Sequence, residues 1–381
     1  METYDLIIAG AGPAGLALAS ELAGSQLKIL LLDKKRDAED VRYHSSGSFI
    51  NPDDWDLPPS VLHPVSTIRF ASKNRTAVKG GRFFTINRKR LLSHLENQAR
   101  SNPHFTVHYS SPVRQVHLTS SGITGITYKK DNAETRVTAK LFVDCSGNRS
   151  VFRKKVDLSK TEPAVAVGAE YIVPLKKGAD ESDLFVGSDF EGGYGWIFPT
   201  DAENAIVGYG TLYKEGFKKV EDNLIKMWEI KRVAERCELK PLQRKIAVLK
   251  TGIPSATLTK NNVVVIGDAA LQANPLAGEG IRFVMDGARI AARYIPAAIE
   301  KNDMGVLENY SRQWQRKYRR KHKMAYMLQQ KIKNHSSDDA ALDFGVKELS
   351  KLSDAEFVKV LSGDLGYLFL LRMFLKSRFR S

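Results

Sequence analysis

Three glycines near the amino terminus have the spacing of a loop that binds a diphosphate. Gly10, Gly12 and Gly15 follow the order G-x-G-x-x-G: the first makes a tight turn, the second lets the backbone approach a pyrophosphate, and the third lets helix and strand pack closely. Asp33 lies eighteen residues after Gly15, at the end of the next apolar run, where its carboxylate could accept both hydroxyls of a ribose. An ordinary tight turn explains the glycines alone but not this combination, so the pattern predicts dinucleotide binding.

The stretch Gly267–Gly280, GDAALQANPLAGEG, is a second candidate site. It follows the apolar run Val263–Ile266 and opens a long helical pattern, so a buried strand ends and a helix begins there. Gly278 and Gly280 allow close backbone approach, and the N–H groups of a helix start suit an anionic or electron-rich ligand. Asp268 is the only acidic group near the strand end. The stretch predicts a ligand site at this junction.

Three aromatic residues alternate along one predicted strand. Tyr194, Trp196 and Phe198 are spaced by two residues, which places all three side chains on one face of the strand. Such a face is either a core stripe or the wall of an apolar pocket, and the spacing alone favours neither.

The eight histidines form no metal-binding cluster. His104 and His108 lie in an alternating, strand-like segment, where a spacing of four residues separates two side chains by roughly 13 Å. We predict no metal site.

The elements around the glycine loop predict an α/β domain. Short apolar strands at Tyr4–Ala9 and Lys28–Leu32 flank the first helix, and a second helix spans Arg88–Arg100. The alternating segment Phe105–Val143 predicts a β-meander, which ends in the polar loop DCSGNRS. Open α/β sheets place ligands at such strand ends, so this loop is a further candidate.

After Lys160 the pattern changes to that of an antiparallel sheet. Alternating strands at Val165–Val173, Ala205–Leu212 and Ile246–Leu249 surround an amphipathic helix over Phe217–Arg236. The overall expectation is α+β: a Rossmann-like dinucleotide domain with a β-meander, an antiparallel-sheet substrate domain and a C-terminal helical region. Their ranges are 1–60, 80–155 and 255–300 for the first, 61–79 and 156–254 for the second, and 301–381 for the third.

The net charge of +15 and the pI near 9.6 imply an anionic partner. The run Arg316–Lys323 lies in a helical segment beside Trp314 and Met327, and the chain ends in apolar residues next to lysine and arginine. This combination suits a helix resting on an anionic membrane, although a solvated charged face is the simpler alternative. No groove-reading module is evident, so nucleic acid is not expected.

The chain carries few signals for its compartment. Cys145 and Cys237 exclude a disulfide framework and fit a reducing cytoplasm. No signal peptide is visible, and the late apolar run Gly366–Leu375 is interrupted by Arg372 and too short to span a bilayer. We expect a cytoplasmic protein, with peripheral attachment to the inner face of the membrane as an option. The oligomeric state cannot be inferred.

Taken together, the motifs resemble those of a known enzyme family. GAGPAG, the helix led by Arg88, DCSGNRS and GDAALQANPLAGEGI, in this order, resemble FAD-dependent enzymes of the p-hydroxybenzoate hydroxylase fold over roughly residues 1–300. YGWIFP followed by GYG, and GEGI ahead of Gly287-Ala288-Arg289, are similar to the geranylgeranyl reductases, which saturate isoprenoid double bonds. The C-terminal DLGYLFLLRMFLKSRF is similar to the tail of that family.

The resemblance implies where FAD binds. The pyrophosphate would lie on the glycine loop, the adenosine ribose on Asp33, the ribityl chain on Asp268, and the pyrimidine edge of the isoalloxazine along the start of the late helix. Arg88 would reach the diphosphate or ribityl region. The implied residues are Gly10, Gly12, Ala14, Gly15, Asp33, Arg88, Gly267, Asp268, Gly278, Glu279, Gly280 and Ile281. We expect the Glu279 carboxylate to point away from the flavin, because it would oppose a flavin anion.

Two positions depart from the family pattern. Many members have an aspartate directly before the glycine of the mid-chain loop, whereas this chain has Ser146, with Asp144 two places earlier. Some reductases have a cysteine-glycine pair where this chain has Ser46-Gly47. A role that depends on a cysteine is therefore not expected.

The implied reaction is reduction of a prenyl-lipid double bond. An unactivated alkene accepts hydride poorly, so hydride delivery from flavin N5 needs protonation as well, and Tyr194, Trp196 and Phe198 would form the tunnel wall. The proton donor is open among His44, Ser46 and a water. The external reductant is equally open between NADPH or NADH and ferredoxin.

Three alternatives stay open from the sequence. A flavin monooxygenase or halogenase acting on an aromatic or lipophilic substrate would share the cofactor motifs. A membrane-surface protein could hold FAD without catalysis, and an enzyme using NAD could share the N-terminal fold.

Overall fold

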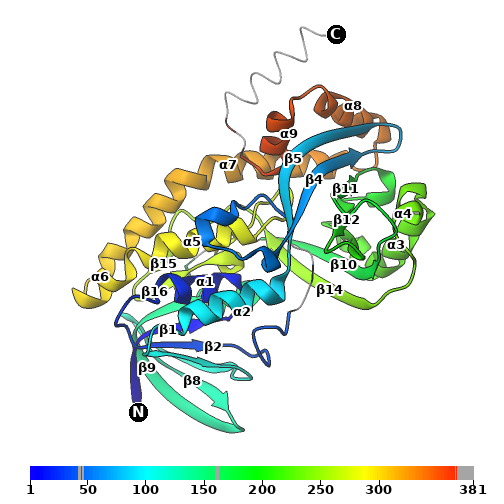
Figure 1. Cartoon of the computed structure of the whole chain (residues 1–381). Coiled ribbons are helices and arrows are strands. Elements are labelled where there is room, and N and C mark those ends of the chain that lie inside the picture. Colours follow the sequence, from blue (N-terminus) through cyan, green and yellow to red (C-terminus); the bar gives the residue numbers. More distant parts are fainter. Residues whose placement is uncertain (42–43, 45–46, 159–162, 365, 367–381) are drawn as a thin grey trace.

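The computed structural model describes residues 1–41, 44, 47–158, 163–364 and 366, and it contains two eight-stranded sheets with helices packed around them (Figure 1). Ser46 and the tail from residue 367, on which two of the expectations rest, lie outside the described residues.

The first sheet has a parallel core whose strands read as continuous apolar runs. Its central strand β1 (Glu2–Ala9) pairs with β2 (Ile29–Leu32) on one side and β9 (Ala133–Asp144) on the other. The core continues to β6 (Phe105–His108) beyond β2 and to β16 (Val263–Val265) beyond β9. Parallel strands covered on both faces need no polar alternation, which explains the apolar runs.

Helices and a meander cover the parallel core. Helix α1 (Pro13–Glu21) packs between α2 (Arg88–Ala99) and α5 (Ile281–Ala292). Strands β7 (Val113–Thr119) and β8 (Gly122–Lys130) extend β9 as an antiparallel meander, and β15 (Thr259–Lys260) pairs with β16.

The meander is shorter than the sequence predicts. The expected span was Phe105–Val143, but β6 is a parallel strand beside β2 and only β7, β8 and β9 form the meander. Between β2 and β6 the chain leaves the first sheet, forms β3, β4 and β5 of the second sheet and returns through α2. A connection of this length, unlike a hairpin turn, allows β6 to lie parallel to β2.

The second sheet is antiparallel except for one pair. From edge to edge, its strands are β14 (Gln243–Thr251), β10 (Ala164–Pro174), β13 (Asn204–Thr211), β12 (Gly193–Pro199), β11 (Glu181–Phe185), β4 (Leu62–Ala71), β5 (Thr76–Ile86) and β3 (Gly47–Ser48). The pair β11 and β4 is parallel. The expected domain ranges placed residues 80–86 and 47–48 with the first sheet, whereas the whole of β5 and β3 lies in the second.

Two expected helices are interrupted. The helix expected over Phe217–Arg236 is split into α3 (Val220–Lys226) and α4 (Lys231–Arg236), joined by one 3-10 turn over Met227–Glu229. The late helix beginning at Ile281 ends at Ala292 and resumes as α6 (Ile295–Glu300), where Pro296 cannot donate the backbone hydrogen bond that continuation needs.

The long helix α7 (Glu308–Asn334) joins the two halves of the molecule (Figure 1). Its Trp314 is fully buried in the core of the first sheet, while Met324 and Leu328 pack against the core on one face of the second. Helices α8 (Asp339–Ser350) and α9 (Asp354–Leu361) cover the same face, and α3 and α4 cover the opposite one. Within the part of the chain that the structure describes, no helix has the length and apolar character to cross a bilayer.

Candidate functional site

Three loops from distant parts of the sequence meet at the carboxyl edge of the first sheet. Gly10 has φ +109°, and a β-carbon there would lie 2.3 Å from the carbonyl oxygen of Cys145. Gly267 has φ +75°, and a β-carbon there would lie 3.0 Å from that of Ala14. The positive φ at both positions, together with these close approaches, favours glycine. The approaches also show that the glycine loop, the mid-chain loop and the late GD pair form one surface.

The glycine loop has the shape that a diphosphate requires. Gly15 lies against the loop itself, since a β-carbon would be 1.9 Å from the oxygen of Gly10. Beside Gly12, the N-cap of α1, no protein atom lies within 4 Å of the position that a β-carbon would take. The open space at this helix start is where an anionic ligand could contact the backbone.

Asp33 is held at the end of β2 by two backbone donors. One carboxylate oxygen accepts a hydrogen bond from Ala11 N at 2.6 Å, and the other accepts from Lys35 N at 2.9 Å. Each oxygen retains a lone pair that could accept a ribose hydroxyl.

Asp144, at the end of β9, organises the mid-chain loop. One carboxylate oxygen accepts from the backbone N and hydroxyl of Ser146, at 3.1 and 2.6 Å. The other accepts from the N–H groups of Phe152 and Arg153, both at 2.8 Å. The side chain is fully buried, so it fixes the loop from within rather than reaching a ligand. The family pattern has an aspartate directly before Gly147. In this chain the nearby acid is Asp144, which holds the loop in place.

Arg88 and Asp268 lie where the first sheet meets a large cavity. Arg88 is the first residue of α2, and Asp268 follows β16 in a short 3-10 turn. Burial raises the pKa of Asp268, and the positive charge of Arg88 opposes that rise. Basic residues at the start of a helix interact unfavourably with the helix dipole. At the start of α2, the nearby carboxyl group of Asp268 lies close to this positive charge.

The cavity has a volume of about 760 Å³ and lies between the second sheet and helices α7, α8 and α9. One end is formed by Arg88, Asp268 and the segment Gly278–Ile281. The rest is largely apolar. Its wall includes Phe49, Ile68, Phe70, Phe83, Leu184, Val186, Tyr194, Trp196, Phe198, Leu328, Ile332, Leu342, Phe344, Val346, Leu349, Val360 and Leu361. The cofactor end predicted from the sequence and an apolar chamber are continuous.

Tyr194, Trp196 and Phe198 all line this cavity, as one strand face should. The centroids of Tyr194 and Trp196 are 5.4 Å apart, and those of Trp196 and Phe198 are 6.2 Å apart. Phe83 continues the row 5.7 Å from Phe198, and Phe49 stands 5.1 Å from Phe83. Sequence reasoning missed these last two residues. They come from other segments, which the pairing of β3 with β5 and of β5 with β4 joins to the second sheet.

Tyr194 connects the aromatic row to the late loop. Its hydroxyl donates to the carbonyl of Ala277 at 2.6 Å. Burial raises the pKa of Tyr194 to about 12, so the side chain is a neutral phenol at physiological pH.

Glu279 is buried, and its charge is compensated within the protein. Its carboxylate accepts from the Ser48 hydroxyl at 2.6 Å and from Phe49 N at 3.0 Å, and it lies 3.2 Å from the guanidinium of Arg282. Arg282 also pairs with Asp364 at 3.1 Å. These partners hold the Glu279 side chain toward the Ser48 segment. Its orientation relative to the flavin stays a prediction.

Of the proton donors left open by the sequence, His44 is the one whose position is described. It is not among the residues that line the cavity. Desolvation, with the nearby charges of Lys245, Lys89 and Arg88, lowers the pKa of His44 to about 4, so its imidazole is neutral near pH 7. A neutral imidazole donates a proton poorly to an alkene. The residues described contain no group of three or more histidines, cysteines or carboxylates placed to hold a metal.

Comparison with known sequences decides the family. The sequence model of a family described as an FAD binding domain matches residues 61–324, which is more than half of the chain. The chain belongs to this FAD-binding family. FAD is accordingly the cofactor, and the protein is an FAD-dependent oxidoreductase.

Its relatives include lipid reductases. Proteins named digeranylgeranylglycerophospholipid reductase from Picrophilus torridus and Methanococcus aeolicus are each 26% identical; the first alignment covers 91% of this chain and 93% of the relative, the second 92% and 90%. A geranylgeranyl bacteriochlorophyll reductase-like structure from Thermoplasma acidophilum matches with a TM-score of 0.86 and 21% identity, over 100% of this chain and 98% of that one. A flavin-dependent brominase matches with a TM-score of 0.76 at 16% identity, over 99% and 100%. These structural likenesses establish the shared fold.

Proposed function

We propose that this chain reduces carbon–carbon double bonds in the prenyl chain of a lipid. The observation that carries the proposal is the apolar, aromatic-lined cavity of about 760 Å³ that begins at Arg88, Asp268 and Gly278–Ile281. A prenyl chain is a flexible hydrocarbon, and a cavity of this volume and lining suits it better than it suits a polar substrate. The names of the relatives point to the same substrate class.

The arrangement of the strand ends supports an assignment of the cofactor residues. We assign the diphosphate to the open face of Gly12 and the start of α1, together with Gly10, Ala14 and Gly15. Asp33 would accept the ribose hydroxyls, and Arg88 and Asp268 would hold the diphosphate and ribityl region. The pyrimidine edge would lie along Gly267 and the Gly278–Ile281 segment.

The protein residues have three tasks in the reaction. FAD, when bound, supplies the hydride. The aromatic row orients the alkene and excludes water, and the π faces of Trp196 and Phe198 stabilise positive charge that develops at the more substituted carbon when a proton is added. Addition of one proton and one hydride saturates one double bond, and an external electron donor restores the reduced cofactor.

Anaerobic turnover with mass spectrometry tests this function. The purified protein, with FAD reduced by dithionite, is incubated with digeranylgeranylglycerophospholipid in detergent. The expected result is a series of products heavier by 2 Da for each double bond reduced, at a rate at least tenfold lower in Trp196→Ala with FAD still bound. No mass gain with a fully reduced, FAD-loaded protein would overturn the proposal. Oxygen-dependent gain of 16 Da on a lipophilic substrate would instead assign a monooxygenase.

A further inference from the structure

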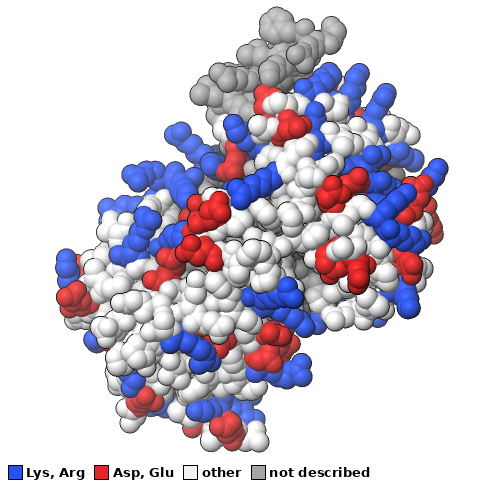
Figure 2. Space-filling view, viewed as in Figure 1, with Lys and Arg blue, Asp and Glu red and all other residues white. Residues whose placement is uncertain are grey.

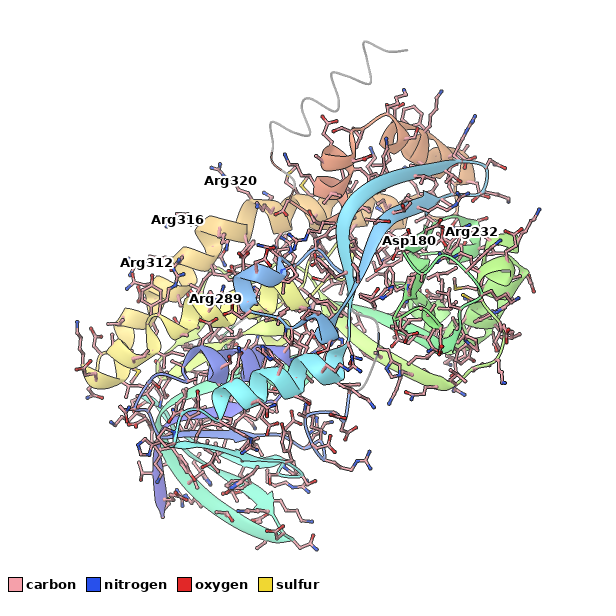
Figure 3. The ribbon with its side chains drawn as sticks, in the orientation of Figure 1. Asp180, Arg232, Arg289, Arg312, Arg316 and Arg320 are labelled. Carbon is pink, nitrogen blue, oxygen red and sulfur yellow. The ribbon has the colours of Figure 1, made fainter. Side chains whose placement is uncertain are left out.

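The exposed side of α7 carries a dense row of cations. Arg312, Arg316, Arg319, Arg320 and Lys323, called here the basic face, are all exposed. Residues three and four apart lie on one side of a helix, so their spacing gathers them into one strip. In Figure 3, Arg312, Arg316 and Arg320 extend from α7 away from the body of the protein, and Figure 2 shows lysine and arginine side chains gathered along that edge.

The basic face is not neutralised by the rest of the described chain. Arg312 has one partner, an exposed Glu308 at 3.5 Å. The other four members of the face form no salt bridge with any residue that the structure describes. By contrast, two other lysines of the same helix have acidic partners. Lys317, which is also exposed, pairs with Asp286 at 2.8 Å, and the half-buried Lys321 pairs with Asp364 at 2.7 Å. The cations that α7 uses for its own packing are thus distinct from those of the basic face.

Apolar side chains continue the strip toward the cavity. Met327 lies four residues after Lys323 and is 56% exposed. Phe344, on α8, is 62% exposed and also lines the cavity. Lys331, four residues beyond Met327, is likewise exposed and lines the cavity. Residues that are both exposed and cavity-lining mark an opening, so the basic face leads to a mouth of the cavity between α7 and α8.

We propose that the basic face, Met327 and Phe344 dock the protein on an anionic lipid bilayer, with the cavity mouth turned toward the membrane. Cations attract anionic headgroups, and exposed Met and Phe side chains beside them insert at the boundary of the acyl chains. An acidic protein partner would use the charges but would gain nothing from a cavity opening among exposed apolar residues. The docking does not depend on the proposed reaction. Only the reason for a cavity mouth that faces the membrane, which is access for a lipid substrate, rests on the proposed function.

Vesicle co-sedimentation tests the docking without turnover. The FAD-loaded protein is mixed with phosphatidylcholine vesicles containing or lacking 30% phosphatidylglycerol. We expect binding to the anionic vesicles only, and loss of binding on raising the salt to about 0.5 M. The triple variant Arg316→Gln/Arg320→Gln/Lys323→Gln should bind roughly 100-fold more weakly, since each cation near an anionic surface is worth about fivefold.

A matched control removes the same charge elsewhere. Arg114, Lys130 and Arg136 are exposed on the meander, and their triple glutamine variant should bind vesicles within about threefold of wild type. Met327→Ser/Phe344→Ser should weaken binding severalfold while leaving its salt dependence in place. Equal losses in both charge variants, or no binding to anionic vesicles alongside saturable binding to an acidic redox protein, would overturn the proposal. If the basic-face variant keeps wild-type turnover on detergent-dissolved lipid, the reaction and the docking are separable.

Discussion

The indole of Trp196 lies directly on Gly208, where a β-carbon would come within 2.1 Å of the ring. The two residues are paired across β12 and β13. Gly210 and Gly168 continue the same flat surface, with β-carbon positions 3.4 and 3.6 Å from the indole. These glycines let the ring lie close to the sheet, so the motif GYG sets the floor of the cavity while YGWIFP supplies its aromatic lining.

Substituting Gly208 with alanine should therefore displace the indole. The added methyl group cannot be accommodated without moving Trp196 into the cavity, and overpacking of this kind costs about 1–3 kcal/mol. We expect a lower melting temperature and at least tenfold slower lipid reduction, with FAD absorbance unchanged. Gly24→Ala is the matched control, because no atom lies within 4 Å of its β-carbon position. A Gly208→Ala enzyme with wild-type turnover would show that the indole position is unimportant.

Asp144→Ala should loosen the mid-chain loop and, through it, FAD binding. The substitution leaves the buried N–H groups of Phe152 and Arg153 without their acceptor, at a cost of about 3 kcal/mol or more. Because the loop contacts Gly10, we expect FAD affinity, measured by fluorescence titration, to fall at least tenfold. Asp131→Asn, at the exposed turn of the meander, should leave affinity and stability unchanged. Equal FAD affinities for all three proteins would argue that the loop does not support the cofactor site.

Features that depend on local chemistry could be read from the sequence. The glycine loop, Asp33, the GD pair and the start of α5 are each a strand end followed by residues with a special backbone role, and parallel pairing brings strand ends together. The aromatic alternation at Tyr194, Trp196 and Phe198 similarly fixes a shared face. What the spacing left open was whether that face was core or cavity.

Features that depend on long-range packing could not be read. Phe83 joins the aromatic row because β5 belongs to the second sheet, and Phe49 joins it because β3 pairs with β5. The cover of the cavity comes from α7, α8 and α9, whose position over the second sheet leaves no periodic signal in the sequence. The partners of Glu279 could not be read from the sequence either. Its position next to α5 suggests a carboxylate at a helix start, but two of its partners, Ser48 and Phe49, come from a distant segment, and the third is Arg282.

His322 should make the fold sensitive to acid. It is buried among Trp314, Tyr318 and Phe283, and its Nε2–H donates to the Gln272 carbonyl at 3.0 Å. Desolvation lowers its pKa from 6.5 to about 4 in the folded state. Below pH 6.5 the unfolded chain takes up a proton that the folded chain does not, so stability falls as the pH drops from 6.5 toward 4.

The size of this effect follows from the pKa difference. At pH 5 the contribution of His322 is about 2 kcal/mol of lost stability, since one pKa unit corresponds to about 1.36 kcal/mol. Urea unfolding at pH 7 and pH 5 should show a smaller loss in His322→Gln than in wild type. His335→Gln, at an exposed position, should have the same free energy of unfolding as wild type at pH 7 and at pH 5. An identical pH dependence in His322→Gln would mean that the buried imidazole is not the group responsible.

Glu279→Gln separates two roles of the buried carboxylate. If the side chain faces Ser48 and away from the flavin, its charge is balanced mainly by Arg282, which keeps Asp364 as a second partner in the variant. The midpoint potential of bound FAD should then shift by less than roughly 30 mV, equivalent to about 1.4 kcal/mol for two electrons. The loss of a charged acceptor for Ser48 and Phe49 should appear instead as a lower melting temperature. Asp364→Asn is the control, because it perturbs Arg282 from the other side. A potential raised well beyond that limit in Glu279→Gln alone would place the carboxylate against the flavin and overturn the predicted orientation.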